Sequence, residues 1–181
     1  MVTGRQIAEK ARDPKYDKVK YDDSDCQDFV ERVLKDCGVR KEDGTVYNWK
    51  GVNSMWRNAF QWKGTIEDCI AAFGEIPLGA WVIIHAYDGG EVARGYHDNE
   101  GNAKHIGIYV GGDDPSKAVR DSTQTRTRDG VGYRKLDGFN MVGLPYMINY
   151  EARVNENKSA IPTIPEALEA LEILTRFMKG V

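Results

Sequence analysis

The sequence predicts an α+β fold in which helices come first and an antiparallel sheet follows. Helical patterns with capping signals occupy the beginning of the chain, around residues 3–13 and 24–38. Two β-rich segments, AWVIIHAY and KHIGIYVGG, come later, and shorter strand candidates follow them. Because helices and strands are grouped along the chain in this order, an α+β arrangement is expected.

Length and composition favour a single folded domain with a short appendage. The chain has 181 residues, of which 41% are hydrophobic and 10% aromatic, so it can bury a core that offsets the entropy of ordering. The formal net charge is −3, and Lys and Arg are scattered among acidic residues. Without a basic patch the chain has no field to attract phosphates, which argues against a nucleic-acid partner.

The sequence shows no targeting or membrane signal. No run of about 18 apolar residues occurs, and the N-terminal stretch MVTGRQIAEKARDPK has no apolar segment of the secretory kind. We therefore expect a chain made in the cytoplasm without a membrane span. If its substrate lies in the cell wall, a lysis pore, a phage particle or a secretion machine must deliver it.

Two helices are expected near the N-terminus, each opened by a capping box. Thr3 and Gln6 have the capping-box spacing, and the helix that they begin is ended by Pro14. Ser24 and Gln27 repeat that spacing and begin a second helix, which ends at a glycine. The apolar residues of the second helix recur at helical intervals and are Cys26, Phe29, Val30, Val33, Leu34 and Cys37.

The rest of the chain contributes shorter elements. Residues 41–63 are aromatic and turn-rich, which predicts a loop with a short helix at 54–60, and 65–73 predicts a capped helix. The shorter strand candidates are 118–122, 131–136 and 141–144. Residues 151–181 are interpreted as a linker and an amphipathic C-terminal helix that follow a domain at 1–150.

The three cysteines are interpreted as free thiols, because their spacings match no zinc pattern and a cytosolic chain seldom carries structural disulfides. Cys26 falls in the first turn of its helix, where free N–H groups and the helix dipole stabilise a thiolate. Its position on the apolar face is also typical of a buried core cysteine. Cys37 and Cys69 lie at or near helix C-termini, where the dipole opposes a thiolate, and are expected to be packing residues.

A cysteine nucleophile needs a base, and three histidines are candidates. His105 opens a β-rich run beside Gly107, so a strand would hold its imidazole rigidly, although a lone strand histidine can also be structural. His85 lies inside the apolar run WVIIHAY and is expected to be structural. His97 lies in the polar loop GYHDNEG, where it is either solvated or lines a groove.

Three segments together resemble the NlpC-type cell-wall cysteine peptidases. DCQDFVERVL resembles their nucleophile helix, which typically reads Asp-Cys-Ser-Gly-Phe-Val, and KHIGIYVGG resembles their base strand. IPLGAWVII stands between them, where the family has a Pro-Gly-Asp-Leu-Val strand. The resemblance covers roughly residues 21–150, with the cysteine before the histidine. It implies a papain-like fold, with the nucleophile helix packed on a small antiparallel sheet.

The resemblance also implies a catalytic triad that works through a thioester intermediate. Cys26 would be the nucleophile and His105 the base, and the third residue would lie on the next strand, in AVRDST. Asp121 is the preferred candidate, because a carboxylate both orients the imidazole and stabilises the imidazolium. Ser122 and Gln124 are the alternatives.

Substrate contacts carry over less completely. In the family, an Asp and a Ser beside the nucleophile hold the free amine of the substrate; Asp25 matches that Asp, whereas Gln27 replaces the Ser. The family's oxyanion-hole Tyr lies in a Trp-Gly-Gly stretch that is missing here, so Tyr21 is a stand-in. Trp56 and Arg94 are candidates for the substrate groove.

The expected function is hydrolysis of peptide bonds between D-glutamate and a diamino acid in the stem peptides of bacterial peptidoglycan. One alternative is a CHAP-like N-acetylmuramoyl-L-alanine amidase or cross-bridge endopeptidase, with the same order of Cys and His. Others are a non-enzymatic cell-wall-binding domain of the same fold and a cytoplasmic peptide-recycling hydrolase. No cofactor or metal is expected, and the chain is expected to act as a monomer.

Overall fold

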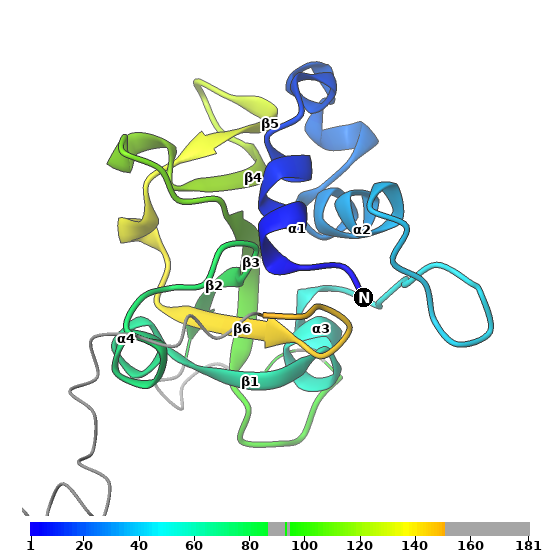
Figure 1. The fold of residues 1–181 in the computed structure, drawn as a ribbon, viewed down its shortest axis with the longest axis vertical. Coiled ribbons are helices and arrows are strands. Elements are labelled where there is room, and N and C mark those ends of the chain that lie inside the picture. The colour runs from blue at the N-terminus through cyan, green and yellow to red at the C-terminus, as the bar shows by residue number, and fades with distance from the viewer. Residues whose placement is uncertain (87–92, 94, 151–181) are drawn as a thin grey trace, which may run out of the picture. The chain divides into compact units, whose positions relative to one another are not determined.

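The computed structural model describes residues 1–86, 93 and 95–150, and its first compact unit runs from Met1 to Glu151. That unit combines helices with an antiparallel sheet, so the α+β prediction is confirmed (Figure 1). The α-helices are α1 (Gly4–Ala11), α2 (Cys26–Asp36), α3 (Val52–Asn58) and α4 (Ile66–Phe73). The strands are β1 (Phe60–Thr65), β2 (Trp81–Ala86), β3 (Asn102–Tyr109), β4 (Val119–Gln124), β5 (Asp129–Arg134) and β6 (Met141–Pro145). Short 3₁₀ helices are η1 (Pro14–Lys18), η2 (Tyr21–Asp23), η3 (Pro115–Lys117) and η4 (Leu136–Gly138).

The six strands form one sheet in the order β1-β6-β2-β3-β4-β5, and every pair of neighbours is antiparallel. β3 lies inside the sheet, between β2 and β4. The register pairs Ile108 of β3 with Arg120 of β4, and Asp121 of β4 with Gly132 of β5. Continuing the first pairing by one residue sets Gly107 opposite Asp121, so both cross-strand neighbours of this carboxylate are glycines.

Helix α2 packs on β3 and β4, beside α1 (Figure 1). Its apolar face is buried as the periodicity predicts, and the buried residues are Cys26, Phe29, Val30, Val33 and Leu34. This face joins side chains of α1, α3, β2 and β3 in the larger of two hydrophobic clusters. The smaller cluster includes Cys69 of α4 and side chains of β2, β4 and β6. The sheet thus supports α2 at the strands that carry His105 and Asp121.

Capping explains where the helices begin, and it corrects one prediction. Thr3 and Gln6 form the expected capping box at α1. At α2 the N-cap is Asp25, whose carboxylate accepts the N–H of Asp28, and not Ser24 as predicted. A carboxylate at the N-cap satisfies an unpaired N–H and also complements the helix dipole, so Asp25 takes the role one residue later. Cys26 is consequently the first residue of the helix.

The later elements agree with the sequence except at β1. The helices near 54–60 and 65–73 are present as α3 and α4, and the three shorter strand candidates are present as β4, β5 and β6. Residues 61–63 were expected to lie in a loop, with Phe60 at the end of one helix and Thr65 at the start of the next, but residues 60–65 pair with β6 along the sheet edge. Their sequence, FQWKGT, has a Gly and no clean alternation, and the strand is defined by its partner.

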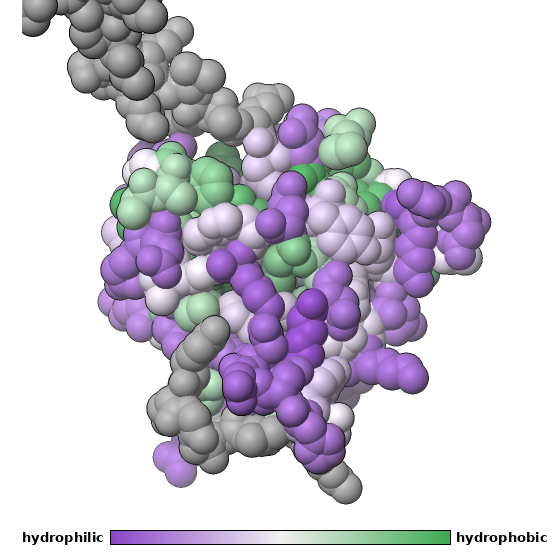
Figure 2. All heavy atoms as spheres, turned by 90° about the horizontal axis from the view of Figure 1, so that it is seen from below, coloured by the Kyte–Doolittle hydropathy of each residue, from purple (hydrophilic) through white to green (hydrophobic). Residues whose placement is uncertain are grey.

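The surface seen from below the view of Figure 1 is mainly hydrophilic, with hydrophobic residues in small patches (Figure 2). Among the described residues, no helix is both long and apolar enough to cross a membrane. The expected linker and C-terminal helix at 151–181 lie outside the described residues.

Candidate active site

Cys26 is placed at the N-terminus of α2 with its sulfur turned into the protein. Its side chain is 7% exposed, and Asp25 caps the helix immediately before it. The sulfur lies within reach of the backbone N–H groups of Gln27 and Ile106. Because Ile106 directly follows His105, the thiol lies beside the part of β3 that carries this histidine.

Burial raises the pKa of Cys26 to about 11, and the charges of Asp25 and Asp121 act in the same direction. The N–H groups of Ile106 and Gln27 oppose this rise but do not overcome it. The helix terminus favours a thiolate, as the sequence predicts, whereas desolvation disfavours it more strongly. At neutral pH the thiol is therefore protonated, and a base has to remove its proton.

His105 and Asp121 form the contact that a triad requires. His105 Nε2 lies 2.7 Å from Asp121 Oδ2, and the carboxylate is fully buried. Since an ionised carboxylate only accepts, Nε2 carries a hydrogen and Nδ1 is the nitrogen free to accept a proton. The ring of Phe139 stacks on the imidazole at 5.9 Å between centroids, which holds the imidazole from one side.

Gly107 allows β3 and β4 to approach at this point. A Cβ at this position would lie 2.7 Å from a methyl carbon of Val119 and 3.1 Å from the Cβ of Asp121. Any side chain here would push the two strands or the carboxylate apart. The glycine that the sequence places beside His105 thus makes room for Asp121.

Asp121 is ionised and held on several sides. Burial opposes its charge, but hydrogen bonds from His105 and Arg128 and the charge of Arg128 hold its pKa below the ordinary value. Arg128 Nη2 donates to Asp121 Oδ1, and Arg134 Nη1 lies 3.5 Å from Oδ2. The sequence singled out neither arginine, because both belong to a different strand or turn and no local motif marks them.

The alternatives for the third residue are engaged elsewhere or exposed. Ser122 is fully buried and donates its hydroxyl to the backbone oxygen of Ser24 at 2.6 Å. This bond ties β4 to the residue before the N-cap of α2. Gln124 is exposed at the end of β4. Only Asp121 of the three contacts His105 among the contacts of the described residues.

The candidate substrate residues near Cys26 have different roles. Tyr21 lies on η2, and burial together with the charges of Cys26 and Asp25 raises the pKa of its phenol, so the phenol is near the thiol. Gln27 donates to Glu31 at 2.7 Å and to the carbonyl oxygen of Trp49 at 2.6 Å. Glu31 in turn accepts the N–H of Trp49, so the two side chains fasten this loop to α2.

The other candidates do not gather around the thiol. Trp56 is 1% exposed, donates to the carbonyl of Glu100 and packs against the ring of His85 in a tilted arrangement, so it is a core residue that presents no surface to a substrate. Trp56 is one of the buried residues of α3. His97 is exposed to solvent, which is one of the two alternatives that the sequence left open for it. Arg94 lies outside the described residues.

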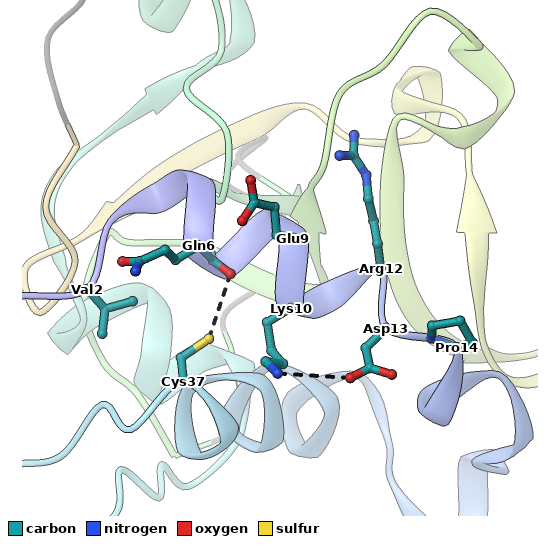
Figure 3. A pocket seen from close by; sticks show the side chains of 8 residues that line it. All are labelled: Val2, Gln6, Glu9, Lys10, Arg12, Asp13, Pro14 and Cys37. Carbon is teal, nitrogen blue, oxygen red and sulfur yellow. Dashed lines mark hydrogen bonds and ion pairs between the residues drawn. The ribbon is translucent and has the colours of Figure 1, made fainter.

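A pocket of about 540 Å³ opens elsewhere, between α1 and the C-terminal end of α2 (Figure 3). Its lining includes Gln6, Lys10, Asp13 and Cys37, and Cys37 contacts the carbonyl of Gln6 at 3.8 Å. Cys26 and Cys37 lie at opposite ends of α2, about 16 Å apart at the usual rise of a helix. This pocket is therefore separate from the candidate triad.

The described residues contain no group of three or more His, Cys, Asp or Glu side chains able to hold a metal ion. No family model matches the chain, and neither the curated proteins nor the solved structures contain a significant match. What the site can do is therefore argued from its geometry: a protonated thiol at a helix N-terminus, beside the segment of β3 that carries an imidazole oriented by a buried carboxylate.

Proposed function

We propose that this chain is a cysteine peptidase with a papain-like fold that hydrolyses peptidoglycan stem peptides, at the bond between D-glutamate and the diamino acid. The observation that carries the proposal is the 2.7 Å contact between His105 Nε2 and Asp121 Oδ2 beside Cys26. The three residues come from α2, β3 and β4, and they match the roles of nucleophile, base and orienting acid.

In the proposed acylation step, His105 Nδ1 takes the thiol proton as the sulfur attacks the carbonyl carbon of the scissile bond. The backbone N–H of Cys26, at the helix terminus, stabilises the oxyanion of the tetrahedral intermediate. Asp121 stabilises the imidazolium that forms. His105 then gives the proton to the leaving amine, the C–N bond breaks and a thioester to Cys26 remains.

In the deacylation step His105 again acts first as a base and then as an acid. His105, now neutral, removes a proton from water, and the resulting hydroxide attacks the thioester carbonyl. The C–S bond breaks, the sulfur recovers a proton from His105, and the carboxylic acid product leaves. The cycle consumes one water and needs no cofactor.

The substrate class rests on the family resemblance of the nucleophile helix and the base strand. Asp25 supports it, because its carboxylate has lone pairs beyond the one that caps α2 and can accept a hydrogen bond from a substrate amine. The segment around Trp49, fastened by Gln27 and Glu31, supplies a fixed wall beside the helix start.

Purified protein incubated with defined peptidoglycan fragments, with products identified by mass, tests this proposal. The expected products carry a new free amine on the diamino acid, and Cys26→Ala yields none. Cys37→Ala is the matched control, because Cys37 lies at the other end of the same helix. Release of glycan with a free lactyl group would instead assign an amidase, and binding without any Cys26-dependent cleavage would refute the peptidase.

A further inference from the structure

Asp121 is flanked by a glycine on each neighbouring strand, and each glycine leaves space for one partner of the Asp121 carboxylate. Gly107 on β3 allows the close approach on the side of His105. On β5, Gly132 pairs directly with Asp121. A Cβ at Gly132 would lie 2.7 Å from Cδ and 3.0 Å from Nη1 of Arg128. The side chain of Arg128 thus crosses the bare backbone of Gly132 to reach Asp121.

Arg128 is fixed at both ends of this path. Its backbone closes the turn between β4 and β5, where its carbonyl accepts the N–H of Thr125 at 2.7 Å and its N–H donates to the Thr125 hydroxyl. Its guanidinium donates from Nη1 to the carbonyl of Tyr133 at 2.8 Å and from Nη2 to Asp121 Oδ1. A planar guanidinium presents its donors to both acceptors in a fixed fork, whereas a lysine ammonium is a point charge without that fork.

The two oxygens of Asp121 are therefore divided between two partners. Oδ1 accepts from Arg128, and Oδ2 faces His105 Nε2 at 2.7 Å. With one oxygen fixed by the guanidinium, the carboxylate cannot rotate away from the imidazole. The positive charge of Arg128 also offsets part of the negative charge of Asp121.

We propose that Arg128 is a positioning residue of the catalytic site, which orients Asp121 toward His105 and offsets part of its charge. The inference rests on the proposed function and adds to it a fourth residue behind the triad. The charged and titratable groups that face this site are His105 on β3, Cys26 and Asp25 at the start of α2, Tyr21 on η2, and Arg134 on β5. Arg134 is farther from the carboxylate and more exposed, so its part is smaller.

The test measures the pH dependence of two rates: kcat/KM on the peptide substrate and alkylation of Cys26 by iodoacetamide. Removing a cation makes protonation of the Cys26–His105 pair easier at a given pH. Arg128→Ala should move the acidic limb of both profiles upward by about 0.5–1 pH unit. It should also lower kcat about 10- to 100-fold through the loss of one charged hydrogen bond that orients the acid.

Three further variants separate charge from geometry. Arg128→Lys keeps the positive charge but not the two donors of the guanidinium fork. The acidic limb of the pH profile should therefore stay in place while kcat falls. Gly132→Ala keeps every charge but displaces the guanidinium, so it should shift the limb in the direction of Arg128→Ala. Arg126→Ala removes an exposed cation from the same turn and should change neither profile.

A fall in rate with both acidic limbs unmoved in Arg128→Ala and Gly132→Ala would overturn the proposal, because it would indicate only a structural role. Wild-type rates in both variants would overturn it as well. Alkylation of Cys26 requires no peptide substrate, so its pH profile tests the role of Arg128 even if no peptidoglycan fragment is cleaved. Should Arg128→Ala not fold, Gly132→Ala gives the same decision through its acidic limb, and Arg128→Lys is the control in which that limb should stay in place.

Discussion

Replacing Asp121 by Asn is a sharper perturbation of the candidate site than its near-identical shape suggests. Asp121 is fully buried and accepts at both oxygens: Oδ1 from Arg128 and Oδ2 from His105 Nε2. An amide has one acceptor and one donor end, so one of the two partners must face an NH₂ group. Arg128 keeps its charge at any pH, so it should win the amide oxygen.

The NH₂ group of Asn then faces His105 Nε2. This nitrogen can accept a hydrogen bond from the NH₂ group only if it no longer carries a hydrogen itself. The hydrogen moves to Nδ1, the nitrogen that has to take the proton of Cys26, and the base is held in the wrong tautomer. Asp121→Ala loses a charged hydrogen bond of about 1.5–3 kcal/mol, equivalent to about a 10- to 100-fold fall in kcat/KM. Asp121→Asn should be at least as slow as Asp121→Ala.

The assay compares kcat/KM for both variants and for Asp121→Asn combined with Arg128→Met. Without the guanidinium the amide oxygen is free to turn to His105, so the double variant should be faster than Asp121→Asn alone. Urea unfolding should show a loss of about 1–3 kcal/mol in the free energy of unfolding for Asp121→Ala, since buried partners lose their acceptor. An Asp121→Asn variant faster than Asp121→Ala would refute the division of the two oxygens.

Three other outcomes follow from the same geometry. His105→Ala should lower kcat/KM about 100- to 10,000-fold, the usual range for a general base, whereas His97→Ala, at an exposed loop position, should change it little. In His105→Ala, alkylation of Cys26 should rise with pH only toward its pKa near 11, since a thiolate forms above the pKa of its thiol; fast labelling near neutral pH would contradict the burial of this thiol. Gly107→Ala should destabilise the fold by about 1–3 kcal/mol in urea unfolding, because its Cβ would lie 2.7 Å from the nearest side chain of β4; a stability equal to wild type would show that the strands can separate at no cost.

Local sequence patterns predicted the parts of the fold that depend on local chemistry. The spacing of Thr3 and Gln6 gives a capping box, and the apolar repeat along residues 26–34 gives the buried face of α2. The strand at His105 follows from its β-rich run. These features need only neighbours three or four residues apart, or alternation along one strand.

Contacts between distant segments could not be read in the same way. Sequence alone proposed Asp121 as the partner of His105, but its two arginines depend on the β4–β5 register and on the turn at Arg128. Gly132 was the available signal, a glycine inside a strand, where a missing side chain usually marks a close approach. The edge strand β1 was missed for a related reason, since pairing with β6 defines it.

The protonated state of Cys26 determines how the proposed peptidase would activate its nucleophile. Burial raises the pKa of the thiol to about 11, while Asp121 is ionised and engaged, so the free protein does not store a thiolate. Proton transfer to His105 must then accompany attack on the substrate, as in hydrolases that use a serine. When a proton is transferred in the rate-limiting transition state, the reaction is slower in heavy water than in ordinary water. We therefore expect a normal solvent deuterium isotope effect on kcat/KM, measured on the plateau of the pH profile. A preformed thiolate would need no such transfer, so an absent or inverse effect would contradict general-base activation of Cys26.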